Sequence, residues 1–275
     1  VMNIPEEPET VLHDITEILP VMILGGPRQW EGWVSKIRAK IAEANRLEKI
    51  IYNLLMPVAL KVADFRLKGE APPFYLKVLY AISEILLLRA IRNRIGLTKA
   101  RFAATAGSVL GQDTTRFINA LGIRLRQVYG SSEGGMISGH KEGDIRIGTI
   151  GTPLPGVKVK ISDEGEILVQ SDYAFTGFYK NPEATAKALK DGWWYSGDAG
   201  HVDEKGHVIF MDRLSELGEL KSGMKYAPQY VESGLRFSTY IKDAMAIGDK
   251  TKDYVTAIII VDFENVGRWA EINRV

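Results

Sequence analysis

Glycine and proline interrupt the chain every few residues between positions 145 and 211, and the apolar runs between them are short. Short apolar runs bounded by turn residues are typical of β-strands. The region is therefore predicted to form a compact antiparallel barrel or sandwich. The turn residues are Gly148, Gly151, Pro153, Pro155, Gly156, Gly165, Gly177, Gly192, Gly197, Gly200 and Gly206.

The residues before this region alternate between strand and helix patterns. Phe102 to Thr105 and Leu125 to Tyr129 are predicted strands, with a helix over residues 111–121 between them. This order favours a parallel sheet. An earlier apolar run, Val21 to Leu24, ends at Gly25-Gly26-Pro27. It predicts a buried parallel strand followed by a turn.

Helical periodicity covers most of the first hundred residues, and a mixed pattern covers the last sixty. Apolar side chains recur at helical spacing over residues 28–49, 50–66 and 74–95, and Thr10 can cap a short helix through Ile18. Residues 217–275 predict a small α+β unit. Its elements are a helix from Pro228 to Phe237, a strand around Met245 and a strand from Val255 to Val261.

One helical segment, Phe74 to Leu88, is unusually apolar. It contains Lys77 and Glu84, and it is shorter than the roughly 20 apolar residues that cross a bilayer. We predict a helix buried in the core, with a helix lying on a membrane surface as the alternative.

These patterns predict an α/β fold in three parts. Residues 1–144 would be the second part of a large α/β domain with a partial parallel sheet, and residues 145–212 a β-barrel subdomain. Residues 213–275 would be a hinge and a truncated small α+β C-terminal domain. The net charge of +1 argues against nucleic acid as a partner.

The residue types that are missing or scattered exclude some chemistries. The chain has no cysteine, which excludes disulfides, thiolate metal sites and a cysteine nucleophile and fits a cytoplasmic protein. His13, His140, His201 and His207 lack the spacing of metal ligands. His140 is therefore interpreted as a structural or surface residue.

The first candidate site is the segment from Tyr129 to Glu133, directly after a predicted parallel strand. Open α/β sheets bind ligands at the carboxyl ends of such strands. Tyr129 could stack on a flat ring, Ser132 could donate to a phosphate oxygen, and Glu133 could hold Mg²⁺, which prefers hard oxygen ligands. The alternative is a polar turn with a half-buried tyrosine.

Two further candidates end predicted strands. Asp198, after Tyr195-Ser196-Gly197, could accept two hydroxyl donors of a ribose, although an aspartate is also an ordinary turn residue. Arg213, after Met211-Asp212, carries a fork of donors suited to ribose or phosphate oxygens. Its alternative is a surface salt bridge.

The order and spacing of these motifs resemble the adenylate-forming superfamily of acyl-CoA synthetases, luciferases and peptide-synthetase adenylation domains. The resemblance covers nearly the whole chain. Particularly similar stretches are Gly165–Val169, Thr176–Thr185 and Asp191–Trp193, and those that resemble the bacterial long-chain fatty-acid–CoA ligase branch are Ile4–Thr10, Pro27–Glu31 and Arg89–Gly96.

The resemblance implies a role for each candidate residue in the nucleotide site. Tyr129 would pack on adenine, Ser132 would contact the α-phosphate, and Glu133 would bind Mg²⁺. Gly130, in the same loop, would also belong to the nucleotide site. The turn Ala106-Gly107-Ser108 would lie beside the adenine.

The resemblance also places a ribose site and a hinge. Asp198 would hold the ribose hydroxyls, and Arg213 would lie near the same ribose. The hinge falls at Ser215, where the family usually has Asp or Lys. Residues 218–226, which include Gly223, match the loop that lines the pantetheine tunnel during thioester formation.

The implied activity is ATP-dependent activation of a long-chain fatty acid to acyl-AMP, followed by transfer to coenzyme A. Fatty acid, ATP, Mg²⁺ and coenzyme A are the implied ligands, and the implied location is cytoplasmic, with peripheral contact at the inner membrane face as an option. The alternatives are a ligase that passes the acyl group to a carrier protein and a non-catalytic remnant that binds a nucleotide or a partner.

The family's phosphate-gripping loop and terminal-domain lysine find no match in the chain and are expected before Val1 and beyond Val275. We therefore expect a fragment without measurable synthetase activity.

Overall fold

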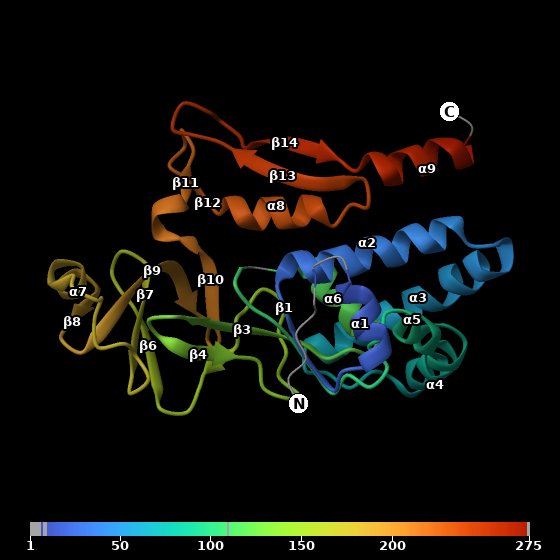
Figure 1. Cartoon of the computed structure of the whole chain (residues 1–275), viewed down its shortest axis with the longest axis horizontal. Helices are drawn as coiled ribbons and strands as arrows, with labels where there is room; N and C mark the ends of the chain where they lie inside the picture. Colours follow the sequence, from blue (N-terminus) through green and yellow to red (C-terminus); the bar gives the residue numbers. More distant parts are fainter. Residues whose placement is uncertain (1–6, 8–9, 109, 274–275) are drawn as a thin grey trace.

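The computed structural model describes residue 7, residues 10–108 and residues 110–273. The stretch Ile4–Thr10, which resembles long-chain ligases, lies mostly outside the described residues. In Figure 1 helices pack around a sheet on one side of the molecule, a curled β region lies beside them, and the C-terminal elements form a layer above both. The predicted fold class, α/β with a partly parallel sheet, a β-rich region and a small α+β unit, is confirmed.

A mixed sheet of five strands in the order β1-β2-β3-β4-β5 forms the centre. The pairs β1·β2 and β2·β3 are parallel, as the strand–helix–strand pattern predicts. The pairs β3·β4 and β4·β5 are antiparallel, so β3 joins a parallel half to an antiparallel half. The strands are β1 (Met22–Gly25), β2 (Phe102–Thr105), β3 (Leu125–Ser131), β4 (Gly135–Gly139) and β5 (Thr152–Pro153).

Helices bury one continuous apolar core beside the parallel half. The core includes Trp30 and Trp33, whose rings meet edge to face at 4.6 Å, together with Leu88 and Ile118. The helices are α1 (Val11–Ile18), α2 (Pro27–Glu43), α3 (Arg46–Leu67), α4 (Phe74–Ser83), the π-helical turn η1 (Glu84–Leu88), α5 (Arg89–Arg94) and α6 (Gln112–Ala120).

The boundary between the first two long helices differs from the expected one. Helical spacing predicts one helix over 28–49, whereas α2 ends at Glu43 and α3 begins at Arg46. The cause is a reciprocal cap: Glu48 N donates to Asn45 Oδ1, and Asn45 N donates to Glu48 Oε2. Such a capping box starts a new helix.

Two segments predicted to be buried are exposed on one face. In β1, Met22 and Leu24 face outward while Ile23 is buried, so the strand is buried on one side only. The segment Phe74–Leu88 buries Leu76, Leu87 and Leu88 but exposes a row of apolar side chains. The prediction of a fully buried helix is therefore wrong for that segment.

The region rich in glycine and proline forms an antiparallel sheet with the order β10-β9-β7-β6, and β8 pairs with β9. It is curled rather than closed, and it packs on the antiparallel half of the first sheet through Ile137, Ile167, Val169 and Trp194. Its elements are β6 (Val157–Ile161), β7 (Glu166–Ser171), α7 (Pro182–Ala188), β8 (Leu189–Lys190), β9 (Trp193–Val202) and β10 (Val208–Arg213).

The C-terminal layer is a small α+β unit, as predicted. Helix α8 packs on the antiparallel pair β13·β14. Ser215, the expected hinge residue, lies in a 3₁₀ turn between β10 and a two-stranded hairpin. The elements are η2 (Leu214–Glu216), β11 (Gly218–Glu219), β12 (Lys225–Tyr226), α8 (Pro228–Arg236), β13 (Ile241–Ile247), β14 (Thr256–Val261) and α9 (Phe263–Asn273).

Candidate functional site

One half of the candidate site is the end of β3 and the tight turn that follows it. Ser131 pairs with Gly135, so residues 132–134 reverse the chain. A Cβ on Gly130 would come within 2.3 Å of the Gly135 carbonyl oxygen, so only glycine lets the two strands approach this closely. The turn is fastened by a hydrogen bond from Gly134 N to Ser131 Oγ (3.0 Å).

The other half comes from two neighbouring strands of the curled sheet. Asp198 on β9 and Arg213 at the end of β10 are cross-strand partners, which places their side chains close together. Asp198 N donates to Ser196 Oγ (3.0 Å), and the Ser196 hydroxyl donates to the Ile167 carbonyl (2.6 Å). The aspartate therefore lies on a backbone fixed by its neighbours.

The two halves meet at the carboxylate of Asp198. Tyr129 Oη donates to Asp198 Oδ2 (2.5 Å), and Arg213 Nη1 lies 2.9 Å from Asp198 Oδ1. Asp198 is 4% exposed. Burial raises its pKa, the hydrogen bond from Tyr129 and the charge of Arg213 act in the opposite direction, and the charge of Glu133 raises it further.

The tyrosine itself is held as a neutral donor. Burial, followed by the charge of Asp198, raises the pKa of Tyr129 above its ordinary value. Its ring lies 5.9 Å from the ring of Phe210, centroid to centroid. The arrangement offers an aromatic surface, one buried carboxylate and one guanidinium within a single hollow.

This hollow has a volume of about 90 Å³. Its lining brings together six of the residues predicted from the sequence: Gly107, Ser108, Tyr129, Gly130, Asp198 and Arg213. Gln127 holds the Gly107-Ser108 turn in place at one side of the hollow, because its Nε2 donates to the Ser108 carbonyl (3.2 Å).

Four predicted residues do not line the hollow. Ala106 precedes the lining turn, Ser132 is exposed at the tip of the β3–β4 turn, and Gly223 lies in the turn between β11 and β12. Glu133 is half-buried in the β3–β4 turn. Because its charge raises the pKa of Asp198, the two carboxylates are electrostatically coupled.

The residues fit a magnesium ion only if a phosphate supplies ligands. Among the residues that the structure describes, no group of three or more His, Asp or Glu side chains could hold a metal ion. Mg²⁺ commonly takes one or two carboxylates together with substrate phosphates and water. Glu133 is the carboxylate that suits this arrangement.

Sequence reasoning gave no role to the six other lining residues: Gln127, Val128, Ser131, Ile150, Phe210 and Gln229. Phe210 had a detectable signal, since it stands three residues before Arg213 on the same strand. Gln229 is on α8 of the C-terminal layer, and no local pattern marks it. The hydrogen bond between Tyr129 and Asp198 was also missed, because it joins residues 69 positions apart.

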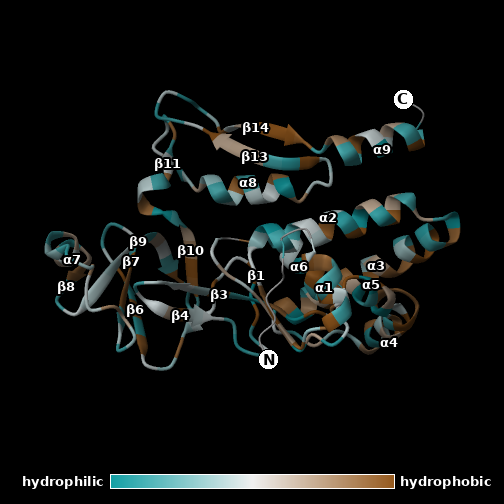
Figure 2. Cartoon of the chain, viewed as in Figure 1, coloured by the Kyte–Doolittle hydropathy of each residue, from teal (hydrophilic) through white to brown (hydrophobic). Residues whose placement is uncertain are grey.

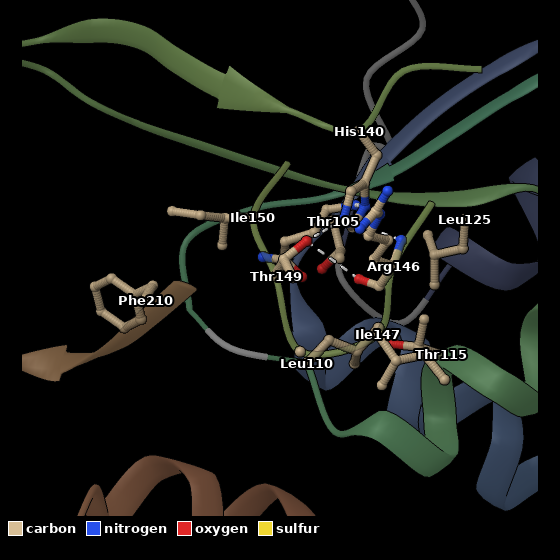
Figure 3. A pocket seen from close by; sticks show the side chains of 12 residues that line it. Thr105, Leu110, Thr115, Leu125, His140, Arg146, Ile147, Thr149, Ile150 and Phe210 are labelled. Carbon is tan, nitrogen blue, oxygen red and sulfur yellow. Dashed lines mark hydrogen bonds between the residues drawn. The ribbon is translucent and has the colours of Figure 1, made fainter. Parts of the chain in front are cut away.

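Beside the hollow lies a second, smaller cavity of about 30 Å³ that shares Gln127, Ile150 and Phe210 with it (Figure 3). His140 and Thr149 line this cavity, and Thr149 lies between His140 Nε2 (2.9 Å) and His207 Nδ1 (3.0 Å). Both histidines are buried. The interpretation of His140 as a structural residue therefore agrees with its surroundings.

Known proteins resemble this chain over most of its length. The model of the AMP-binding enzyme family matches residues 2–179. The long-chain-fatty-acid–CoA ligase FadD15 of Mycobacterium bovis is 30% identical over 255 residues, which are 92% of this chain and 42% of that protein. The chain thus spans less than half the length of this relative.

Solved structures show the same fold. The adenylation domain of the carboxylate reductase from Mycobacterium chelonae has a TM-score of 0.69 at 20% identity, over 95% of this chain and 38% of that one. The adenylation domain of the carboxylic acid reductase from Segniliparus rugosus, in complex with AMP and a carboxylic acid, has a TM-score of 0.62 at 17% identity, over 94% and 38%. With the family match covering well over half of its residues, the chain belongs to the AMP-binding enzyme family.

Proposed function

We propose that the chain carries the nucleotide half of a fatty-acid–CoA ligase active site, with long-chain fatty acids as substrates. The convergence of Tyr129, Asp198 and Arg213 on one hollow, with the Gly107-Ser108 turn opposite, is the observation that carries the proposal. The printed name of FadD15, a long-chain ligase similar over 92% of the chain, supports the substrate class.

Each side chain has a proposed part in binding AMP or ATP. Adenine would enter between the Gly107-Ser108 turn and Tyr129, and Asp198 would accept the ribose hydroxyls, which are stronger donors to a carboxylate than to a neutral group. Arg213 would hold Asp198 ionised and contact the same sugar. Ser132 and Glu133, exposed and half-buried in the turn, would face the phosphates and bound Mg²⁺, whose charge would offset that of the phosphates.

The proposed reaction has two balanced steps. A carboxylate oxygen of the fatty acid attacks the α-phosphorus of ATP, and the bond to the β-phosphate breaks, which releases pyrophosphate and leaves acyl-AMP. The coenzyme A thiol releases its proton to water and its sulfur attacks the acyl carbon. The bond between that carbon and the AMP oxygen then breaks, which leaves acyl-CoA and releases AMP. The residues of this chain contribute mainly by positioning the nucleotide.

Calorimetric titration with AMP tests the nucleotide site. Asp198→Asn keeps the shape of the side chain but removes its charge. A hydrogen bond to a charged group contributes about 1.5–3 kcal/mol, so AMP affinity is expected to fall roughly tenfold or more. Asp163→Asn, an exposed residue of the curled sheet region, is the matched control and should leave affinity unchanged. Equal affinity for the two variants would contradict the proposal.

The pH dependence of AMP binding gives a second readout. Burial raises the pKa of Asp198, so the carboxylate protonates at a higher pH than an exposed aspartate. AMP affinity should therefore weaken on acidification before exposed carboxylates titrate. Because the AMP phosphate itself titrates near about pH 6, the two proteins are compared at each pH, and the unmodified chain should lose more affinity on acidification than Asp198→Asn.

The acyl acceptor is tested with a ligase that includes this chain and activates fatty acids. Coenzyme A and a holo carrier protein are offered as competing acceptors, and formation of each thioester is measured. The proposal predicts thioester on coenzyme A, whereas transfer to the carrier protein alone would favour the carrier-protein ligase.

A further inference from the structure

The segment α4–η1–α5 is one uninterrupted helical rod over residues 74–94. Its inward side is buried through Leu76, Ser83, Leu87 and Ile91. Positions four apart share a face of a helix, so the residues on the opposite side form a row along the rod. We call this row the outer stripe: Phe74, Tyr75, Val78, Leu79, Ile82, Ile85 and Leu86.

All seven residues of the outer stripe are large, apolar and exposed, with Phe74 at 81% and Ile85 at 75%. Single exposed apolar side chains are normal on soluble proteins, but a contiguous row marks a surface that binds something. In Figure 2 the ribbon around α4 is brown at the edge of the molecule, away from the curled sheet and the C-terminal layer. Among the residues that the structure describes, no helix combines the length and apolar character of a bilayer crossing.

The charges around the rod select the class of partner. Residues 46–94 contain nine basic and four acidic side chains, a net charge of +5 in a chain of +1. On the rod itself Glu84 is paired with Arg92, while Lys77, Arg89 and Arg94 are exposed. Apolar side chains flanked by unneutralised lysine and arginine suit a surface with an apolar interior and anionic headgroups.

A second group of exposed apolar side chains, Ile258 to Ile260 on β14, provides an internal comparison. The residues around it, 241–264, contain three basic and five acidic side chains, so their net charge is negative. That surface would be repelled by anionic lipid, whereas the rod would be attracted.

We propose that the outer stripe docks the protein on an anionic lipid bilayer, with its apolar side chains among the acyl chains and Lys77, Arg89 and Arg94 at the headgroups. Docking does not depend on the nucleotide hollow. The role of docking in catalysis rests on the proposed function, because a long-chain fatty acid partitions into bilayers and a docked ligase would take it up there.

Flotation of the chain with lipid vesicles tests the proposal. The vesicles are phosphatidylcholine alone or phosphatidylcholine mixed with phosphatidylglycerol, each with and without added sodium chloride. The chain should float with the mixed vesicles, bind phosphatidylcholine more weakly and dissociate as salt rises, because surface electrostatics are screened. Absence from both vesicle types would overturn the proposal.

Two pairs of variants assign the binding to the stripe. Phe74→Ser with Ile85→Ser should lower binding about tenfold or more, and Phe263→Ser with Ile258→Ser is the matched control, since Phe263 is also 81% exposed at the start of a helix. Lys77→Glu with Arg89→Glu should abolish the preference for phosphatidylglycerol. The matched control is Lys187→Glu with Lys205→Glu. Both lysines are exposed on the curled sheet region, and the pair makes the same change in net charge.

Three outcomes decide the matter. Loss of vesicle binding in the stripe variants alone, with AMP affinity retained, supports the proposal. Equal losses in the matched controls overturn it. If the stripe variants instead convert a dimer to a monomer in size-exclusion chromatography and still bind vesicles like the unmodified chain, the stripe joins two copies and the proposal is wrong. AMP titration of every variant separates these results from a failure of the nucleotide site.

Discussion

At the scale of single residues, the buried carboxylate of Asp198 is the centre of the candidate site. The resemblance to the adenylate-forming superfamily predicts that Asp198 and Arg213 lie near one ribose. Asp198 is expected at the end of a strand but lies inside β9 (Trp193–Val202), where cross-strand pairing brings it to Arg213. The sequence does not allow the prediction that Tyr129 donates to Asp198. That bond depends on how the curled sheet packs on β3, which no local pattern encodes.

A second residue-scale feature is a directed hydrogen-bond chain that begins at His140 and Thr149 in the smaller cavity (Figure 3). Gln127 N donates to His140 Nδ1 (3.0 Å), so neutral His140 carries its proton on Nε2 and donates to Thr149. His207 Nε2 lies 2.8 Å from Asp144 Oδ2, and Arg146 Nε donates to Asp144 Oδ1 (2.8 Å). The chain connects β3 to the curled sheet, and a proton added to His140 would break it.

Acid should therefore destabilise the fold through His140. Burial, followed by the charge of His207, lowers the pKa of His140 from 6.5 to about 4. Between these values the unfolded chain binds a proton that the folded chain does not, so the free energy of unfolding falls as pH drops from 6.5 to 4. The loss is roughly 3 kcal/mol at most.

Urea unfolding across this pH range measures the effect. His140→Gln should flatten the dependence, whereas His201→Gln, at an exposed position on β9, should leave it as in the unmodified chain. Identical pH slopes for the two variants would refute the assignment to His140.

At the scale of elements, β3 determines the geometry of the site by changing from parallel to antiparallel pairing within seven residues. The predicted strand Leu125–Tyr129 captures the parallel part. The extension to Ser131 and the tight turn could not be predicted, because they depend on the approach of β4 at Gly130. Likewise, Asn45 and Glu48 could have revealed the start of α3, whereas nothing local distinguishes the outward side of α4 from a core-facing one.

Gly130→Ala tests the role of this close approach. The added methyl would meet the backbone of Gly135 and Met136, which cannot yield as a side-chain tip can, so stability should fall by about 1–3 kcal/mol and AMP affinity should fall with it. Gly32→Ala, in α2 with nothing within 4 Å of the new methyl, should be neutral or stabilise by about 0.5–1 kcal/mol. Thermal melts and AMP titrations of both variants are the measurement, and unchanged affinity in Gly130→Ala would contradict the account.

At the scale of the whole molecule, ion pairs connect the C-terminal layer to α2. Arg236 on α8 lies 3.0 Å from Glu31 on α2, and the two side chains are 13% and 6% exposed. Burial raises the pKa of Glu31 although Arg236 opposes the shift. The sequence marks Pro27–Glu31 as a family-like stretch, but its partner is 205 residues away, so the contact could not be predicted.

Removing the buried arginine should therefore cost much more than removing an exposed one. Arg236→Met leaves Glu31 buried and unpaired, a loss of about 3–5 kcal/mol. Arg268→Met removes a more exposed ion pair between α9 and α2, in which Arg268 Nη1 lies 2.8 Å from Glu43 Oε1. The expected loss of unfolding free energy is less than about 1 kcal/mol. Chemical unfolding of the two variants compares them, and equal losses would show that burial does not set the strength of this contact.

The central claim is that residues distant in sequence form one nucleotide site at the junction of β3 and the curled sheet. The most direct measurement is a crystal structure of the chain grown with AMP. The account predicts adenine between the Gly107-Ser108 turn and Tyr129, with both ribose hydroxyls on the carboxylate of Asp198. AMP bound elsewhere, with Asp198 still joined only to Tyr129 and Arg213, would contradict it.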